Sequence, residues 1–145
     1  MALEMNEPLL APDYKPSKDE AYMNPMMIAY FKKKLVDWRR DLLEGSTDTI
    51  HTLQAETREE PDVADRASAE TDRAIELRTR DRERKLISKI DEALQRIASG
   101  SYGYCEETGE PIGVARLEAR AIATLSLEAQ ERHERKERTR VDQRV

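Results

Sequence analysis

Residues 24–60 decide the fold: they read NPMMIAYFKKKLVDWRRDLLEGSTDTIHTLQAETREE, and Pro61 follows directly. Asn24 followed by Pro25 is typical of a helix start, with Asn as the N-cap and Pro in the first helical position. Apolar or small residues then recur with mostly alternating spacings of three and four, which is typical of a coiled-coil seam. They are Ile28, Phe31, Leu35, Trp38, Leu42, Gly45, Thr49 and Leu53. The stretch predicts one long helix that ends at Pro61.

A second helix is predicted from about Asp65 to Ser99, with Gly100 as the glycine that stops it. Its expected stripe is Ile75, Thr79, Arg82, Leu86, Ile90, Ala93 and Ile97. Each helix would have about 35 residues and span roughly 50 Å. Two helices of matched length with a short connector predict an antiparallel hairpin over residues 24–100, with its tip at 61–67. Two unrelated helices in a bundle are the alternative, but few apolar residues lie outside the two stripes to supply a third layer.

The remaining segments differ from the hairpin in composition. Residues 1–23 are interrupted by prolines, and Ser17 with Glu20 resembles a capping box that would begin a short helix. Residues 101–124 are richer in glycine and proline, with a turn at EETGEP and room for one short helix at VARLEARA. Residues 125–145 predict a charged helix and tail, capped by Ser126 or Thr124. The predicted fold is mainly α: a long antiparallel coiled-coil hairpin plus a small globular module with a C-terminal helix.

Composition excludes several classes of function. The 145 residues carry a net charge of −5, whereas sequence-independent DNA binding and membrane-surface binding need a basic footprint. No apolar run reaches the ~20 residues of a membrane span, and MALEMNEPLL lacks the features of a secretory signal. The single cysteine excludes an internal disulfide framework. We expect a cytoplasmic monomer that binds neither DNA nor a membrane.

Two clusters of charged residues have open interpretations. Asp62 and Asp65 at the connector can cap the second helix, or the hairpin can carry these carboxylates to a distant site that holds metal or basic groups. The run ELRTRDRERK can form a solvated helix face with local ion pairs. Alternatively, Lys85 and Lys89 can converge with Arg116 and Arg120 into a basic patch, which would suit a polyphosphate ligand or an acidic protein surface.

Cys105 lies in YGYCEETGEPIG, residues 102–113, which looks like one half of a zinc knuckle. The second cysteine of such a half-site would stand at position 108, which is Thr. No general base is adjacent in sequence, so a catalytic nucleophile is disfavoured and a small packed residue is the preferred interpretation. A metal site built from Cys105 and His133 would need two further ligands.

Four segments together resemble the DksA family of bacterial transcription factors: DVADRA, ELRTRDRERKLISKIDEAL, YGYCEETGEPIGVARLEARA and the charged terminal helix. The resemblance runs from about residue 24 to 138 and includes a D-x-x-D-x-A tip motif as Asp62, Asp65 and Ala67. It implies a globular domain with a hairpin that enters the secondary channel of RNA polymerase, core or holoenzyme, without binding DNA. The tip would alter open-complex stability together with the alarmone ppGpp, as in the stringent response.

The same resemblance implies roles for individual residues. Leu86, Lys89 and Arg120 match ppGpp-contacting positions, whereas Gln130 stands where the family has a further lysine. Arg82 and Arg116 match polymerase-facing arginines.

Zinc-bearing relatives use a C-x2-C-x17-C-x2-C pattern, and its positions here are Cys105, Thr108, Ser126 and Ala129. The chain thus resembles a zinc-free, reduced-cysteine branch of the family and is expected to hold no metal cofactor. The hydroxyls of Thr108 and Ser126, together with apolar packing, are expected to replace the metal. The packing candidates are Tyr102, Tyr104, Ile112, Leu117, Leu125 and Leu127.

The expected function is that of a transcription regulator and not of an enzyme. A Gre-type factor is one alternative, because it also inserts an acidic-tipped hairpin but stimulates transcript cleavage by polymerase. A coiled-coil scaffold that never contacts polymerase is a second alternative, although a scaffold would not need the tip motif.

Overall fold

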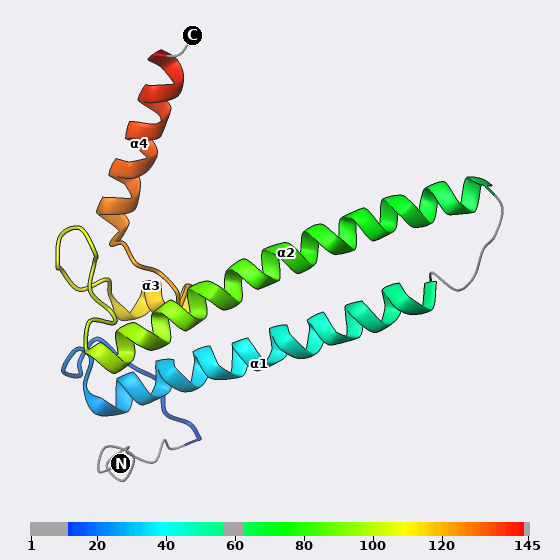
Figure 1. Cartoon of the computed structure of the whole chain (residues 1–145). Coiled ribbons are helices and arrows are strands. Elements are labelled where there is room, and N and C mark those ends of the chain that lie inside the picture. The colour runs from blue at the N-terminus through cyan, green and yellow to red at the C-terminus, as the bar shows by residue number, and fades with distance from the viewer. Residues whose placement is uncertain (1–11, 57–62, 144–145) are drawn as a thin grey trace. The chain divides into compact units, whose positions relative to one another are not determined.

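The structure, a computed structural model, describes residues 12–56 and 63–143, and their side chains over 12–45 and 65–141. Within these residues it contains four helices: α1 (Pro25–Glu56), α2 (Val63–Ser99), α3 (Val114–Ala119) and α4 (Leu127–Gln143) (Figure 1). In these described ranges the only β-type pairing is an isolated bridge between Tyr104 and Pro111, so the mainly α fold is confirmed. None of the described helices is long and apolar enough to cross a membrane.

The chain divides into two compact units. The first, which we call the module, comprises residues 1–35 and 93–145 within the described ranges. The second, which we call the hairpin unit, comprises residues 36–92. In the hairpin unit α1 and α2 run side by side in opposite directions (Figure 1), and Arg39 Nε pairs with Asp91 Oδ1 at 2.8 Å. The predicted antiparallel hairpin is therefore confirmed in residues 36–56 and 63–92, whereas residues 57–62 lie outside the described residues.

The ends of the two long helices follow the sequence signals closely. Asn24 Oδ1 accepts a hydrogen bond from the Met27 N–H at 3.0 Å, so Asn24 caps α1 as predicted. At the end of α2, Gly100 has a φ of 83°, and its N–H donates to the Ile97 carbonyl at 3.3 Å. The Ser101 N–H donates to the Arg96 carbonyl at 2.9 Å. These two bonds form a Schellman motif, which needs a left-handed residue and therefore favours glycine.

The predicted short helix near Ser17 is wrong, because residues 18 and 19 form a turn and residue 20 a bend. One half of the capping box is present, since the Ser17 N–H donates to Glu20 Oε2 at 3.1 Å. The same oxygen accepts a bond from the Tyr14 hydroxyl at 3.0 Å, which ties Glu20 back toward the N-terminal side. Met23 then has a φ of 54°, a left-handed conformation that no helix could pass through.

The buried stripe of α2 differs from the predicted one in the first half of the helix. Ile75 is 53% exposed, and Thr79 and Arg82 are exposed as well. The less exposed positions over residues 65–90 are Ala69, Arg73, Glu76, Arg80, Glu83, Leu86, Ile87 and Ile90. All of them except Leu86 form one stripe, which we call the α2 seam. Toward the N-terminus of α2, this seam continues the spacing of Ile90, Leu94 and Ile97, with successive positions alternately three and four residues apart. Helix geometry fixes which positions face inward, so charged residues occupy the seam and the apolar Ile75 does not.

The module contains most of the core. Its buried residues are Met27, Phe31, Leu35, Ala93, Tyr102, Cys105, Ile112, Val114, Leu117, Ala121, Ile122, Ala123 and Ala129. The rings of Phe31 and Tyr102 lie 5.9 Å apart, and the Tyr102 hydroxyl donates to the Ala121 carbonyl at 2.7 Å. Burial of the Tyr102 hydroxyl disfavours its charged form and raises its pKa. The hydroxyl therefore stays protonated and keeps its hydrogen bond.

Candidate functional site

Residues 102–113, which we call the knuckle, fold into a closed loop in the module. The Ile112 N–H donates to the Gly103 carbonyl and the Cys105 N–H to the Glu110 carbonyl, both at 2.8 Å. The Gly109 N–H returns to the Cys105 carbonyl at 2.9 Å, and Gly109 has a φ of 74° that suits glycine in this turn. These backbone hydrogen bonds therefore give the loop the shape of a metal-binding knuckle.

The Cys105 thiol lies at the centre of this loop and is only 3% exposed. Burial by itself would raise its pKa, but the Thr108 hydroxyl and the backbone N–H groups of Ser126, Thr108 and Glu107 donate to the sulfur. These bonds outweigh burial and lower the pKa of Cys105 from 9.0 to about 6. The predicted packed cysteine is confirmed as buried, but the sequence interpretation missed the hydrogen-bond donors that lower the pKa of its thiol.

The four residues at the positions of the zinc pattern make contacts other than metal ligation in this structure. Thr108 and Ser126 bond to the Cys105 sulfur, whereas Ala129 is fully buried. The Ser126 hydroxyl accepts a bond from the Ala129 N–H at 3.3 Å and so caps α4 as predicted. Among the residues that the structure describes, no group of three or more His, Cys, Asp or Glu could hold a metal ion. One thiolate, two hydroxyls and a methyl group do not make a zinc ligand set.

The packing that was predicted to replace the metal is only partly correct. Tyr102, Ile112 and Leu117 are buried as expected. Tyr104 is 37% exposed and Leu127 is 59% exposed, so the prediction is wrong for these two side chains. Tyr104 instead packs edge-on against Tyr22, with ring centroids 5.6 Å apart, and Leu127 begins α4 on the surface.

Two side chains outside the zinc pattern also hold the knuckle. His133 on α4 pairs through Nε2 with Glu107 Oε1, so the histidine weighed as a metal ligand contacts a carboxylate instead. The Tyr22 hydroxyl donates to the Gly103 carbonyl at 2.6 Å and accepts from the Gly113 N–H at 3.0 Å. Sequence reasoning missed both contacts, since they join residues that are far apart along the chain.

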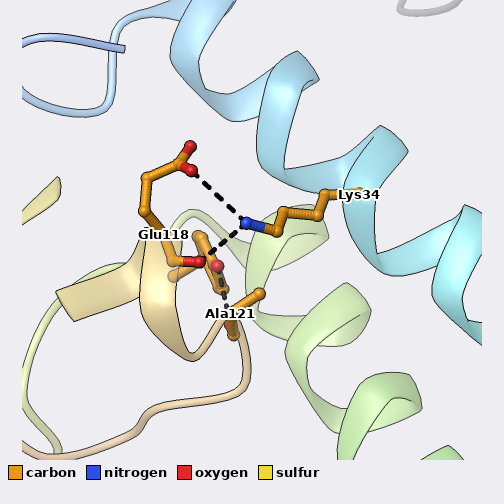
Figure 2. A network of polar contacts seen from close by, with 4 residues as sticks. Lys34, Glu118 and Ala121 are labelled. Atoms are coloured by element: carbon orange, nitrogen blue, oxygen red, sulfur yellow. Dashed lines mark hydrogen bonds and ion pairs between the residues drawn. The ribbon is translucent and has the colours of Figure 1, made fainter. Parts of the chain in front are cut away.

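A lysine and a glutamate fix α3 in the module (Figure 2). Lys34 Nζ donates to the Glu118 carbonyl at 2.7 Å and lies 3.4 Å from Glu118 Oε2. The Tyr30 hydroxyl bonds to the same carboxylate, which together with burial raises the pKa of Tyr30 to about 12. These contacts position the last turn of α3 and therefore the backbone of Arg120, which donates its N–H to the Arg116 carbonyl at 2.8 Å.

The predicted ppGpp-binding residues are divided between the two units. Leu86 is half-buried and Lys89 is exposed, one helical turn apart on α2 in the hairpin unit. Arg120 is exposed at the end of α3 in the module. Gln130, which occupies the position of the further family lysine, donates to Glu134 Oε1 at 3.4 Å.

The two predicted polymerase-facing arginines differ in their surroundings. Arg82 is exposed on α2. Arg116 is half-buried, and its Nε donates to the Leu125 carbonyl at 2.9 Å, so part of this guanidinium has a structural role.

The predicted tip is only partly described. Asp65 and Ala67 are exposed in the first turns of α2, and Asp62 lies outside the described residues. An acidic residue in a first turn interacts favourably with the helix dipole, so the capping interpretation of Asp65 stays open beside the functional one.

Comparisons with known proteins agree with this architecture. Residues 27–97 match the family described as DnaK suppressor protein DksA, N-terminal domain, and residues 100–135 match the prokaryotic dksA/traR C4-type zinc finger. A relative from Caulobacter vibrioides, named RNA polymerase-binding transcription factor DksA, is 65% identical over 130 residues, covering 90% of this chain and 92% of the relative. The protein of the same name from Escherichia coli K12 is 42% identical over 115 residues, covering 79% and 76%.

A solved structure shares the fold. Transcription factor DksA2 from Pseudomonas aeruginosa superposes with a TM-score of 0.78 at 43% identity, covering 84% of this chain and 94% of that structure. The matched zinc-finger segment carries only one of the four cysteines here, and its residues do not fit zinc. Both sequence segments and the fold nevertheless match in order, and the chain belongs to the DksA family.

Proposed function

We propose that this chain is a transcription regulator that binds RNA polymerase directly, as a monomer in the cytoplasm. Its hairpin tip enters the secondary channel of the enzyme and alters the stability of promoter open complexes together with ppGpp. The observation that carries this proposal is the 65% identity to a DksA protein over 92% of that relative's length.

The proposed tip function is supported by the composition of the hairpin unit. Residues 65–89 of α2 are exposed or half-buried throughout, and Asp65 lies at the end nearest the connector. A narrow helix pair that ends in carboxylates can approach a metal-containing or basic centre in a channel too narrow for a compact domain. The tip would add little contact area with polymerase. It would therefore affect catalysis, whereas the rest of the protein surface would supply the affinity for polymerase.

The proposed ppGpp contacts are supported by the availability of two cations. Lys89 and Arg120 are both exposed, and neither forms an ion pair with any residue in the described part of the chain. Each could make charge-assisted hydrogen bonds with phosphate oxygens, on the order of 1.5–3 kcal/mol per bond. Gln130 offers no such charge, so we expect weaker ppGpp binding than in a relative with lysine at this position.

We further propose that the module keeps its shape without zinc. The knuckle backbone bonds, the hydrogen-bonded Cys105 sulfur, the Ser126 cap and the Glu107–His133 pair supply the connections that a metal would otherwise make. The regulator would then work under conditions that remove zinc. DNA is not proposed as a partner, because the chain has a net charge of −5.

Promoter-specific transcription with purified polymerase tests these proposals. We expect the protein to change transcript yield and open-complex lifetime, with a larger change when ppGpp is present and no change when a strong chelator is added. Metal analysis of the same preparation should find no stoichiometric zinc, and promoter DNA alone should not be retarded in a gel. Regulation that disappears with the chelator would contradict zinc independence. Cleavage of stalled transcripts without any promoter effect would instead favour a Gre-type factor.

A further inference from the structure

A groove of about 500 Å³ within the module, which we call the module groove, is lined by apolar side chains and three cations. The apolar residues come from the end of the knuckle, from α3 and from the start of α4, and include Ile112 and Val114. The cations are Lys18, Arg116 and Arg120, and no acidic side chain is among the lining residues. Because the whole chain has a net charge of −5, this local excess of positive charge favours an anionic ligand.

Lys18 is the one cation of the groove that sequence reasoning missed. It lies outside both segments that match the family, residues 27–97 and 100–135. Its side chain is exposed and forms no ion pair with the residues that the structure describes. The two acidic residues that follow it, Asp19 and Glu20, do not line the groove. The charge of Lys18 is therefore available to a ligand.

Contacts within the module hold the turn that carries Lys18. Glu20 Oε2 accepts hydrogen bonds from the Ser17 N–H at 3.1 Å and from the Tyr14 hydroxyl at 3.0 Å. The ring of Tyr14 packs edge-on against Tyr30 of α1, with ring centroids 6.0 Å apart. The turn is thereby tied to α1, so Lys18 starts from a fixed backbone position beside the groove and loses less freedom when it binds a ligand.

The two arginines of the groove are fixed in a similar way. The Arg120 N–H donates to the Arg116 carbonyl at 2.8 Å, which holds the two backbones one turn apart. Arg116 Nε donates to the Leu125 carbonyl at 2.9 Å, which leaves its Nη groups for other acceptors. A guanidinium can bind two oxygens of one phosphate, and an ammonium adds a mobile point charge. Two guanidinium groups and one ammonium therefore suit a ligand with several phosphates.

The side chain of Gln130 lies near the same groove. Leu127 lines the groove, and residues three apart on a helix are neighbours on one face. Gln130 is half-buried and follows Leu127 by three residues on α4. A lysine at position 130 would thus stand beside the groove, whereas the glutamine brings no charge there.

We propose that Lys18 is a third phosphate-binding cation of the module, and that it supplies from the N-terminal segment part of the positive charge that Gln130 does not supply from α4. The inference rests on the proposed binding of ppGpp and adds to that site a residue from outside the family-matched segments. The phosphates would lie toward Lys18, Arg116 and Arg120.

A ppGpp titration of promoter-specific transcription, with polymerase and the full-length protein, tests the role of Lys18. Lys18→Gln should raise the half-maximal ppGpp concentration about threefold to tenfold, less than for a desolvated ion pair because Lys18 is exposed. Lys18→Arg keeps the charge and should keep most of the response. Lys15→Gln removes another exposed lysine of the same segment, one that does not line the groove, and should change nothing.

A second substitution tests whether Lys18 and position 130 serve the same ligand. Gln130→Lys, added to Lys18→Gln, should lower the half-maximal ppGpp concentration again, because an ammonium would reach the groove from α4. Gln130→Met has a similar length without the charge and should give no recovery. Equal results from the lysine and the methionine would refute the shared role of the two positions.

The remaining outcomes separate this inference from the proposed function. A normal ppGpp response in Lys18→Gln, beside a normal response of the unmodified protein, would refute the role of Lys18 and retain the proposed ppGpp binding. An equal loss of regulation with and without ppGpp would make Lys18 a polymerase contact and also overturn the inference. No ppGpp response of the unmodified protein would refute the proposed ppGpp function and this inference with it. Circular dichroism of each variant checks that the fold is unchanged.

Discussion

The module and the hairpin unit differ in the kind of side chain that they bury. Thirteen of the fourteen buried apolar residues among the described side chains belong to the module, and Ile90 alone belongs to the hairpin unit. The α2 seam of the hairpin unit instead carries Arg73, Glu76, Arg80 and Glu83 at half-buried positions. The module is therefore held by a packed core, whereas the α2 seam of the hairpin unit places charged side chains where a core would be, and buried polar atoms of Arg73, Glu76 and Glu83 have no hydrogen-bond partner among the residues that the structure describes.

This contrast suggests a division of labour. A packed core fixes the positions of surface groups, so the module can present Arg120 in one place. A helix pair with a polar seam has few buried apolar contacts and therefore a low local stability. Variants of each unit test this division of labour.

The largest effect is expected at the tip. Asp65→Asn should abolish promoter regulation, with Asp62→Asn as a weaker change, because the carboxylate charge is lost while the shape is kept. Polymerase affinity and the melting temperature should stay nearly the same. Transcription on a regulated promoter and competition binding to polymerase measure the two properties. Normal regulation by both Asn variants would mean that these aspartates serve only as helix caps.

In the module core, Phe31→Ala should lower the free energy of unfolding by about 3–5 kcal/mol, because it leaves a cavity beside Tyr102. Leu77→Ala removes an exposed leucine of the hairpin unit and should cost less than about 1 kcal/mol. Urea denaturation followed by circular dichroism compares the two variants. Similar losses in both would contradict the contrast between the units.

A third prediction concerns ligand binding. Lys89→Ala and Arg120→Ala should each weaken ppGpp binding to the polymerase complex by about 1.5–3 kcal/mol and spare regulation without ppGpp. Arg84→Ala removes another exposed cation from α2 and serves as the matched control. An unchanged ppGpp response in the Lys89→Ala, Arg120→Ala double variant would refute the assignment of both residues.

A fourth prediction concerns Cys105. The folded thiol has a pKa of about 6 and the unfolded thiol one near 9.0, so between these values the unfolded chain binds more protons. Stability should therefore rise with pH from 6 to 9 and fall as pH drops through 6. Cys105→Ser should lack this slope and lower the free energy of unfolding by roughly 1–2 kcal/mol. Thiolate absorbance against pH measures the titration, and a midpoint near 9 would refute the hydrogen-bonded thiolate.

The smallest effect is expected at the α2 seam. Glu83→Leu replaces a half-buried carboxylate, one oxygen of which is buried without a hydrogen-bond partner, by an apolar side chain. The free energy of unfolding should rise by about 1 kcal/mol. Arg82→Leu changes the neighbouring exposed position and should give no gain. Equal gains from both variants would place the seam elsewhere.

Local signals made much of the fold predictable from sequence. Asn24–Pro25, Gly100 and Ser126 mark helix ends through contacts within a few residues, and all three ends are correct. The spacing of Phe31 and Leu35 likewise identified core residues of α1, because apolar side chains and helix geometry agree there.

The errors arose where residue type and geometry disagree, or where partners are distant in sequence. Ile75 is apolar but faces outward, whereas Glu76 is charged but faces the seam, so hydrophobicity misplaced the stripe. The spacing of the zinc pattern brought Thr108 and Ser126 to Cys105, but it did not reveal that backbone N–H groups also lower the pKa of the thiol. The groove beside Arg120 likewise forms from Lys18, the knuckle, α3 and α4, which meet only in the folded module.

The bonds of Tyr22 to Gly103 and Gly113 span 81 and 91 residues of sequence. During synthesis on the ribosome, Tyr22 and Phe31 emerge long before Tyr102, Leu117 and Ala129, which complete the same core. The nascent chain must therefore expose these apolar residues while the entire hairpin is being synthesised. We expect chaperones to bind this region in that interval. In ribosome-stalled chains extended by a C-terminal linker, protease protection of Phe31 should appear only after Ala129 has left the exit tunnel. Protection in chains stalled before Tyr102 would show that α1 finds a temporary partner earlier.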